Sequence, residues 1–226
     1  MLGSVTRSAA QCRRIAVLAL LAAPLPLAAQ GRMVAPLFEI FATYSRPPLA
    51  SAVADAYSLS GGLKAGAGVG AAVGVSMRNV ELAGFYEIAT TSLARPVSAG
   101  DSRDFTRKAA GVRLEVELAT IGAQFRGLVS GSAFLQSLGR AQVEGRLANG
   151  QPTATLVTVS QSEALGGRIE AGVEHRGFIN TVWFVTGGVS MAGAGRGAWR
   201  ENTDRRGGFG AVPIVTLGLR TRNWSR

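Results

Sequence analysis

Apolar side chains alternate with small or polar ones along residues 63–88. In the first half of this stretch the odd positions carry side chains such as Val69 and Val73, and the even positions between them carry Lys, Gly, Ala or Ser. A period of two predicts a β-strand with two different faces. The alternation resumes after Arg78 and Asn79, so the two halves together predict a β-hairpin.

The same period of two recurs in other segments of the chain. It is cleanest before residue 118, where Leu114 and Val116 share an apolar face and Arg113 and Glu115 lie on the opposite one. These further segments lie at residues 37–45, 105–118, 124–147, 153–174, 179–191 and 211–220. With the first hairpin they make eight segments, which predict an all-β protein with antiparallel, up-and-down strands.

The first thirty residues have the pattern of a secretory signal peptide. Arginines precede an apolar run at residues 15–23, and small residues suited to cleavage follow at 27–30. A membrane helix requires about 20 apolar residues, and this run is shorter. It therefore predicts a signal for export and not a membrane anchor. We therefore expect residues 1–30 to be removed and residues 31–226 to form one barrel domain.

No later segment is apolar over enough residues to form a membrane helix. If the mature chain crosses a membrane, it must therefore do so as a closed β-barrel. The single cysteine, Cys12, lies in the predicted signal, and the single histidine is His175. A zinc site would have almost no ligands to draw on, so we expect no metal and no cofactor.

The predicted connections alternate between long and short. This is the asymmetry of outer-membrane barrels, which have short periplasmic turns and longer outer loops. The long connections are at residues 46–62, 97–104, around Asn149 and at 193–208, and the short ones are at 78–79, 120–122 and 175–177. We therefore expect the apolar face of the strands to meet lipid.

The polar faces of the strands carry both signs of charge. We expect these side chains to neutralise one another inside a narrow lumen, because unpaired charge there would be very costly. The glycines of residues 66–71 are expected to leave room for them. The expected interior ion network consists of Glu39, Lys64, Glu81, Glu87, Arg113, Glu115, Glu117, Arg126, Arg168, Glu170, Glu174 and Arg220.

The closing segment, residues 218–224, looks like the terminal assembly signal of bacterial outer-membrane barrels. Residues 37–224 resemble the OmpA/OmpX-like eight-stranded outer-membrane β-barrels in pattern and topology. The resemblance implies an eight-stranded antiparallel up-and-down transmembrane β-barrel after a cleaved N-terminal signal peptide. It also implies insertion by the barrel-assembly machinery into the outer membrane of a Gram-negative-type bacterium, in contact with outer-membrane lipid.

Aromatic residues lie near both ends of the predicted strands. Amphipathic rings favour the membrane interfaces, so we expect two girdles of them. Those expected near the short turns are Phe38, Phe125, Phe178 and Trp224, and those expected near the long loops are Tyr44, Phe105, Phe134 and Phe209.

Three patterns suggest chemistry, and each has a plainer interpretation. Residues 66–71 fit the dinucleotide pattern G-x-G-x-x-A, but a strand continues where that motif needs a helix. His175 and Glu174 lie at a predicted short turn, whereas a membrane-embedded lipid hydrolase would need the histidine at the outer rim. Glu115 and Glu117 share a face as paired carboxylates would, but arginines surround them. We therefore expect no enzyme.

Lys and Arg exceed Asp and Glu by 10 in this 226-residue chain. No basic run is interleaved with aromatic residues, so we expect no nucleic-acid partner. An eight-stranded barrel is just wide enough to be filled by side chains, which argues against an open general porin. Function is then expected in the outer loops, as adhesion, surface stabilisation or ligand contact. The alternatives are a membrane-embedded lipid hydrolase, a narrow channel and a soluble lipocalin-like carrier.

Two outer connections are candidates for contacts. The Asn149-Gly150 hairpin ends two long alternating segments and predicts an exposed ribbon, which could hold a surface protein partner. The basic loop 193–208 is a candidate for contact with anionic groups such as lipopolysaccharide phosphates, because arginine pairs well with phosphate oxygens. Its candidate residues are Arg196, Trp199, Arg200, Arg205 and Arg206.

Overall fold

The structure is a computed structural model, and it describes residues 34–49, 63–92, 104–122, 124–146, 152–177, 181–193, 195–196 and 209–221. Side chains are described within these ranges except at 104–105, 141–146 and 152–159. The predicted signal peptide, residues 1–30, lies outside them and stays a prediction. No helix within these ranges is long and apolar enough to cross a membrane.

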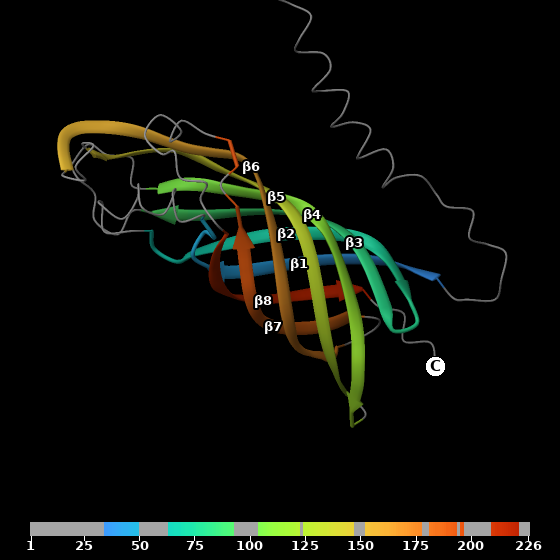
Figure 1. The fold of residues 1–226 in the computed structure, drawn as a ribbon. Helices are drawn as coiled ribbons and strands as arrows, with labels where there is room; N and C mark the ends of the chain where they lie inside the picture. Colours follow the sequence, from blue (N-terminus) through green and yellow to red (C-terminus); the bar gives the residue numbers. More distant parts are fainter. Residues whose placement is uncertain are drawn as a thin grey trace, which may run out of the picture. The chain divides into compact units, whose positions relative to one another are not determined.

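Eight antiparallel strands form a closed barrel in which each strand lies beside the next one along the chain (Figure 1). The strands are β1 (Val34–Ser45), β2 (Gly66–Met77), β3 (Val80–Ser92), β4 (Asp104–Ile121), β5 (Phe125–Arg146), β6 (Pro152–Arg176), β7 (Thr181–Ala192) and β8 (Gly210–Thr221). The barrel closes where β1 pairs with β8, with Glu39 opposite Arg220. This confirms the all-β, eight-stranded antiparallel fold that the alternation predicted.

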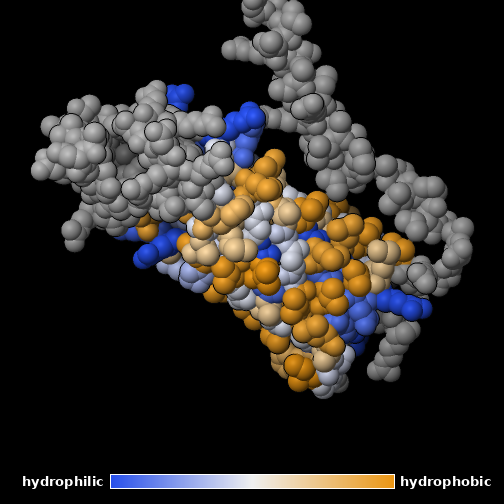
Figure 2. Space-filling model, viewed as in Figure 1, coloured by the Kyte–Doolittle hydropathy of each residue, from blue (hydrophilic) through white to orange (hydrophobic). Residues whose placement is uncertain are grey.

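Each strand has a lumenal face and an outward face, because successive side chains of a strand point to opposite sides of the sheet. On β3, Glu81 and Glu87 are buried in the lumen, whereas Leu82 and Tyr86 are each 47% exposed on the outside. Apolar side chains cover much of the wall formed by the described strands (Figure 2). The apolar faces therefore point outward, which is the reverse of the apolar interior expected of a soluble lipocalin-like carrier.

The two ends of the barrel differ in their connections. Short turns follow β2, β4 and β6, and we call this the short-turn end; the opposite end is the long-loop end. Toward the long-loop end β5 and β6 are the longest strands, with 22 and 25 residues. They pair with each other as far as Arg146, whereas β4 stays paired with β5 only to Leu138 and β7 stays paired with β6 only to Gly166. The two strands thus continue as a ribbon, and the predicted hairpin at Asn149-Gly150 lies outside the described residues.

The ribbon begins at an irregularity in β6. The register between β5 and β6 shifts after Gln136, and Glu163 has a positive φ of 52°. Beside it, Ser162 pairs with Arg196 in an isolated bridge, and the Ser162 hydroxyl donates a 3.0 Å hydrogen bond to the carbonyl oxygen of Arg196. This part of the connection between β7 and β8 is therefore tied to β6.

Three phenylalanines, Phe41, Phe85 and Phe134, meet edge to face inside the lumen and form what we call the aromatic layer. A Cβ at Gly70 would lie 2.3 Å from the Phe41 ring, and a Cβ at Gly166 would lie 2.3 Å from the Phe134 ring. The expectation that lumenal glycine such as Gly70 makes room for charged groups is therefore wrong, because a ring occupies that space. Phe134 is 2% exposed, so its predicted place in an interfacial girdle is wrong as well.

Candidate functional site in the barrel lumen

Arg220 on β8 is the centre of an ion cluster toward the short-turn end of the lumen. It is 1% exposed, and its guanidinium lies within ion-pair distance of four carboxylates on other strands. Its Nη1 donates to Glu81 at 2.7 Å and also to Glu115, and its Nε lies 3.4 Å from Glu39. The fourth carboxylate, Glu174, has its Oε2 at 4.0 Å from Nη1.

Arg113 on β4 is the second arginine of this cluster. Its Nη1 donates a 2.7 Å hydrogen bond to Glu39, and its Nη2 donates to the other oxygen of the same carboxylate. Such a bidentate pair fixes the orientation of both groups. Its Nε also lies 4.0 Å from Glu115. We call the whole group the inner cluster, and its members are Glu39, Glu81, Arg113, Glu115, Glu174 and Arg220.

Glu87 on β3 is the centre of a second group, the outer cluster, which lies nearer the long-loop end. Arg107 Nη2 donates to one oxygen of the Glu87 carboxylate, and Arg168 Nη2 donates a 2.8 Å hydrogen bond to the other. The hydroxyl of Thr43 adds a hydrogen bond of 3.1 Å. Because Glu87, Arg107 and Arg168 are each 4% exposed or less, these charges are almost fully withdrawn from water.

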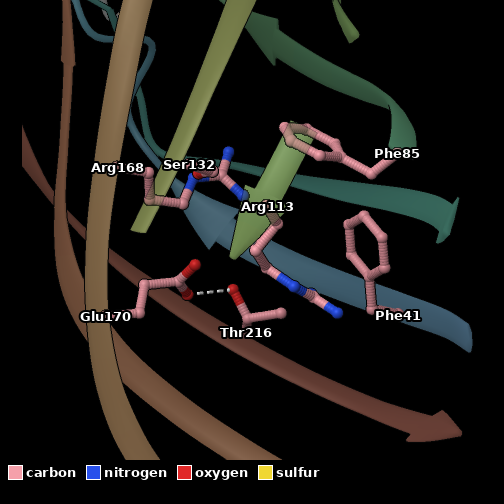
Figure 3. A pocket seen from close by; sticks show the side chains of 7 residues that line it. All are labelled: Phe41, Phe85, Arg113, Ser132, Arg168, Glu170 and Thr216. Atoms are coloured by element: carbon pink, nitrogen blue, oxygen red, sulfur yellow. Dashed lines mark hydrogen bonds between the residues drawn. The ribbon is translucent and has the colours of Figure 1, made fainter. Parts of the chain in front are cut away.

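Glu170 on β6 lies beside a small cavity that Arg113 and Arg168 also line. Its Oε1 accepts hydrogen bonds from Thr186 at 2.8 Å and from Thr216 at 2.6 Å. Figure 3 shows Glu170 and Thr216 on one side of the cavity and two rings of the aromatic layer on another. The cavity measures about 10 Å³, which is room for about one water molecule.

The buried arginines also pack on aromatic rings. The guanidinium carbon of Arg220 lies 4.2 Å from the ring centroid of Phe184, and that of Arg168 lies 5.5 Å from the centroid of Phe134. A cation over the face of a ring is attracted by the ring's electrons, most strongly where water is excluded. The rings therefore help to hold both guanidinium groups in the lumen.

Two buried glutamines lie at the long-loop end. Gln136 on β5 donates a 2.9 Å hydrogen bond to Gln161 on β6. Gln136 also donates to the carbonyl oxygen of Pro48 at 3.0 Å, and Gln161 donates to that of Gly193 at 3.1 Å. Two long connections, after β1 and after β7, are thus held where they leave the barrel.

The structure brings most residues of the predicted ion network together in the two clusters. Arg126 and Glu117 form a separate pair at 3.0 Å. Glu170 is held by threonine hydroxyls. Lys64 is exposed instead and lies two positions before β2, although its backbone N–H still donates a 2.9 Å hydrogen bond to the carbonyl oxygen of Ser92 on β3.

Arg107 belongs to the outer cluster although the predicted network omits it. It lies on the same face of β4 as Arg113, six positions earlier along the chain. Side chains on one face of a strand are separated by even numbers of residues, so this spacing is the signal that identifies Arg107. The buried pair of Gln136 and Gln161 is also absent from the predicted set, because neither residue is charged.

The motifs that resembled catalytic sites belong to strands and to side-chain packing in the structure. Residues 66–71 lie in β2 and continue as a strand. His175 Nε2 lies 3.3 Å from Gln124 Oε1, and its ring packs against Phe125 with centroids 4.7 Å apart. In the described part of the chain, no group of three or more His, Cys, Asp or Glu side chains is placed to hold a metal ion.

One residue of the proposed anion contact is described. Arg196 is exposed, and its Nη1 lies 3.3 Å from the carboxylate of Glu163, which is exposed as well. The remaining candidates in this loop, Trp199, Arg200, Arg205 and Arg206, lie outside the described residues.

Comparison with family models and with curated proteins finds no match for the chain. Among solved structures, the chain is similar to Neisserial surface protein A (NspA) over 84% of its own length and 99% of the other chain, with a TM-score of 0.53 and 13% identity. It also matches the N-terminal β-barrel domain of Pseudomonas aeruginosa OprF, over 82% and 96% of the two chains, with a TM-score of 0.39 and 14% identity. The attachment invasion locus protein Ail of Yersinia pestis matches over 82% and 96%, with a TM-score of 0.38 and 10% identity. The closed barrel of β1–β8 and its similarity to NspA show that the chain has the fold of outer-membrane β-barrels, as its resemblance to the OmpA/OmpX-like barrels predicted.

Proposed function

We propose that this chain is an outer-membrane protein of a Gram-negative-type bacterium, exported through a cleaved signal at residues 1–30 and acting at the cell surface. The barrel is the anchor, inserted by the barrel-assembly machinery that its closing segment 218–224 would address. The outer connections carry the function, in adhesion, surface stabilisation or ligand contact. The lumen is closed to diffusing solutes, and we assign no catalytic role to it.

The filled lumen is the observation that carries this proposal. The inner cluster, the aromatic layer and the outer cluster occupy the interior, and the cavity between Arg113, Arg168 and Glu170 measures only about 10 Å³. An eight-stranded barrel has little space beyond its own side chains. A solute would have to break buried ion pairs to pass, and separating such pairs in the interior is strongly unfavourable.

Planar-bilayer recording tests the closed lumen. We expect the purified, heat-modifiable barrel to insert without stepwise ion conductance, under conditions in which an open porin gives clear steps. Regular conductance steps from the unmodified chain would contradict the proposal and favour the narrow channel instead.

Location and orientation have a separate test. We expect the chain to fractionate with outer membranes and to change its gel mobility on boiling, as closed barrels do. A protease site inserted at Asn149 should be cleaved in intact cells, and the same site inserted at Asn79 in a short turn should be cleaved only after permeabilisation. Cleavage in the opposite pattern would reverse the topology and remove the Asn149-Gly150 ribbon as a contact for a surface protein.

The loop 193–208 is the proposed contact for anionic surface groups such as lipopolysaccharide phosphates. It is rich in arginine, and the planar guanidinium donates paired hydrogen bonds to phosphate oxygens. Arg196 supports the proposal, because its side chain is 77% exposed. Its pair with Glu163 is also open to water, where ion pairs are weak and exchange readily for another anion.

Charge-matched variants test this contact. Replacing Arg205 and Arg206 by Gln should weaken lipopolysaccharide binding in a salt-dependent way, because exposed charges are screened by salt. Replacing Arg78 and Arg176, which are exposed at the short-turn end, removes the same charge and should leave binding unchanged. If both double variants lose binding equally, net charge and not the loop is responsible. If the unmodified protein does not bind at all, the loop has no such role.

A further inference from the structure

We propose that Arg220 is an electrostatic latch, a side chain that makes closure of the barrel depend on neutralisation of the inner cluster. Arg220 lies on the last strand of the barrel, β8, and its carboxylate partners lie on strands that precede it in the chain. This role concerns how the closed state forms, and it is independent of what the outer connections bind.

The seam between β1 and β8 contains one charged pair. Of the residues that face each other across this seam in the described register, only Glu39 and Arg220 carry charge. Both side chains are fully buried in the lumen, and Arg220 Nε lies 3.4 Å from Glu39 Oε2. One position further, the backbone N–H of Phe38 donates a 3.1 Å hydrogen bond to the hydroxyl of Thr221, which extends the seam by a side chain. Arg220 therefore links the first and last strands directly.

The strands before β8 already carry the carboxylates of the inner cluster. Glu39, Glu81, Glu115 and Glu174 come from β1, β3, β4 and β6, and Arg113 is the one arginine that these strands contribute to the cluster. Closing the sheet brings these carboxylates into a space with little water, where repulsion between like charges is strong. Arrival of β8 delivers a second guanidinium to the same place. Repulsion between the carboxylates therefore opposes closure of the sheet until Arg220 lies among them.

Arg220 is also suited to this task by its surroundings. Besides Glu39 at the seam, its ion pairs reach carboxylates on β3, β4 and β6, and its planar group packs on Phe184 of the adjacent β7 at 4.2 Å. Five donors in a fixed fork allow one guanidinium to serve several carboxylates at once, which the single ammonium of lysine does less well. Loss of this one side chain therefore leaves several carboxylates facing each other.

Site-specific disulfide formation during refolding tests the latch. In a Cys12→Ser background, cysteines replace Ala42 and Leu217, which face each other across the β1–β8 seam on the outside of the barrel. A matched pair replaces Leu82 and Leu114, which face each other between β3 and β4. The chain is refolded from urea into phosphatidylcholine vesicles at pH 7 with oxidised glutathione, which is reduced as each protein disulfide forms, and the rate at which each disulfide forms is followed on gels.

Arg220→Gln should slow formation of the seam disulfide at least about tenfold, while the β3–β4 disulfide forms within about twofold of its normal rate. Arg126→Gln, which removes an arginine outside the inner cluster, should change neither rate. Equal slowing of both disulfides by Arg220→Gln, or no slowing of the seam, would overturn the proposal.

A compensating variant separates charge from packing. Adding Glu81→Gln and Glu115→Gln to Arg220→Gln removes the repulsion but does not restore the lost side chain, so the seam should again close within about threefold of the normal rate. If the triple variant closes as slowly as Arg220→Gln, the residue acts by packing and the latch is rejected.

Discussion

The inner and outer clusters of the lumen have opposite arrangements of charge. In the inner cluster one arginine, Arg220, is shared by carboxylates, with Arg113 as a second cation. In the outer cluster one carboxylate, Glu87, is shared by Arg107 and Arg168. The described inner cluster thus contains more acids than bases, and the outer cluster contains more bases than acids.

This difference shows that the same substitution has different consequences at the two ends. Removing the shared group of either cluster leaves several like charges facing each other with little water between them, which is the most costly change. Removing one of the groups in excess reduces repulsion and costs little. The role of a lumenal glutamate therefore depends on its place in the cluster and not on its residue type.

The largest expected effect is that of Glu87→Gln, which removes the shared carboxylate of the outer cluster. We expect it to lower the free energy of unfolding by roughly 3 to 5 kcal/mol, because two buried guanidinium groups lose their partner. Glu81→Gln is the matched control in the inner cluster, where acids are in excess, and should cost far less. Urea unfolding of both variants in lipid vesicles measures the difference, and equal losses would refute the comparison.

The next effect extends the comparison from the lumen to the outer wall. Val116 is exposed on the outside of β4, so Val116→Arg should cost roughly 2 to 4 kcal/mol if this position lies near the middle of the bilayer. Glu117→Gln, at the neighbouring position on the lumenal face, should disturb insertion less. The fraction of heat-modifiable barrel in membranes reports both, and equal tolerance would reverse the assignment of the two faces.

A smaller effect is expected in the aromatic layer. A Cβ at Gly166 would lie 2.3 Å from the Phe134 ring, so Gly166→Ala should lower the free energy of unfolding by roughly 1 to 3 kcal/mol through overpacking. Gly131→Ala is its control, because a Cβ there meets nothing within 4 Å. A variant at Gly166 as stable as that at Gly131 would show that the layer is loosely packed.

The smallest effect is expected for the pair outside both clusters. Arg126 and Glu117 lie 3.0 Å apart, but their side chains are 23% and 13% exposed, so water screens them more than it screens the clusters. Arg126→Gln should therefore cost about 1 kcal/mol or less, and the loss should shrink further at high salt. A cost as large as that of Glu87→Gln would show that water screens this pair no more than it screens the buried clusters.

The alternation along the chain was sufficient to predict the eight strands and their faces, because strand geometry alone sends successive side chains to opposite sides. Glu39, Glu115 and Arg168, which the alternation assigns to the polar faces, are buried. The same rule places the side chain of Phe134 in the lumen. The assignment of Phe134 to a girdle is wrong because it rests on the nearness of this residue to a strand end and not on the face of the strand. Lys64 differs because the alternation does not show where a strand ends, and Lys64 lies two positions before β2 with its side chain exposed.

Which charges meet was decided by closure of the barrel. Arg220 and Glu81 are 139 positions apart, and Arg220 and Glu115 are 105 positions apart. No local pattern connects such residues, since their contact depends on the tilt and stagger of the strands and on the join between β1 and β8. The sequence by itself therefore determined a barrel with a charged interior face. Only the tertiary structure decided that its charges divide into two clusters of opposite arrangement, because each cluster includes partners on strands that do not adjoin in the sheet, such as β4 and β8 or β3 and β6.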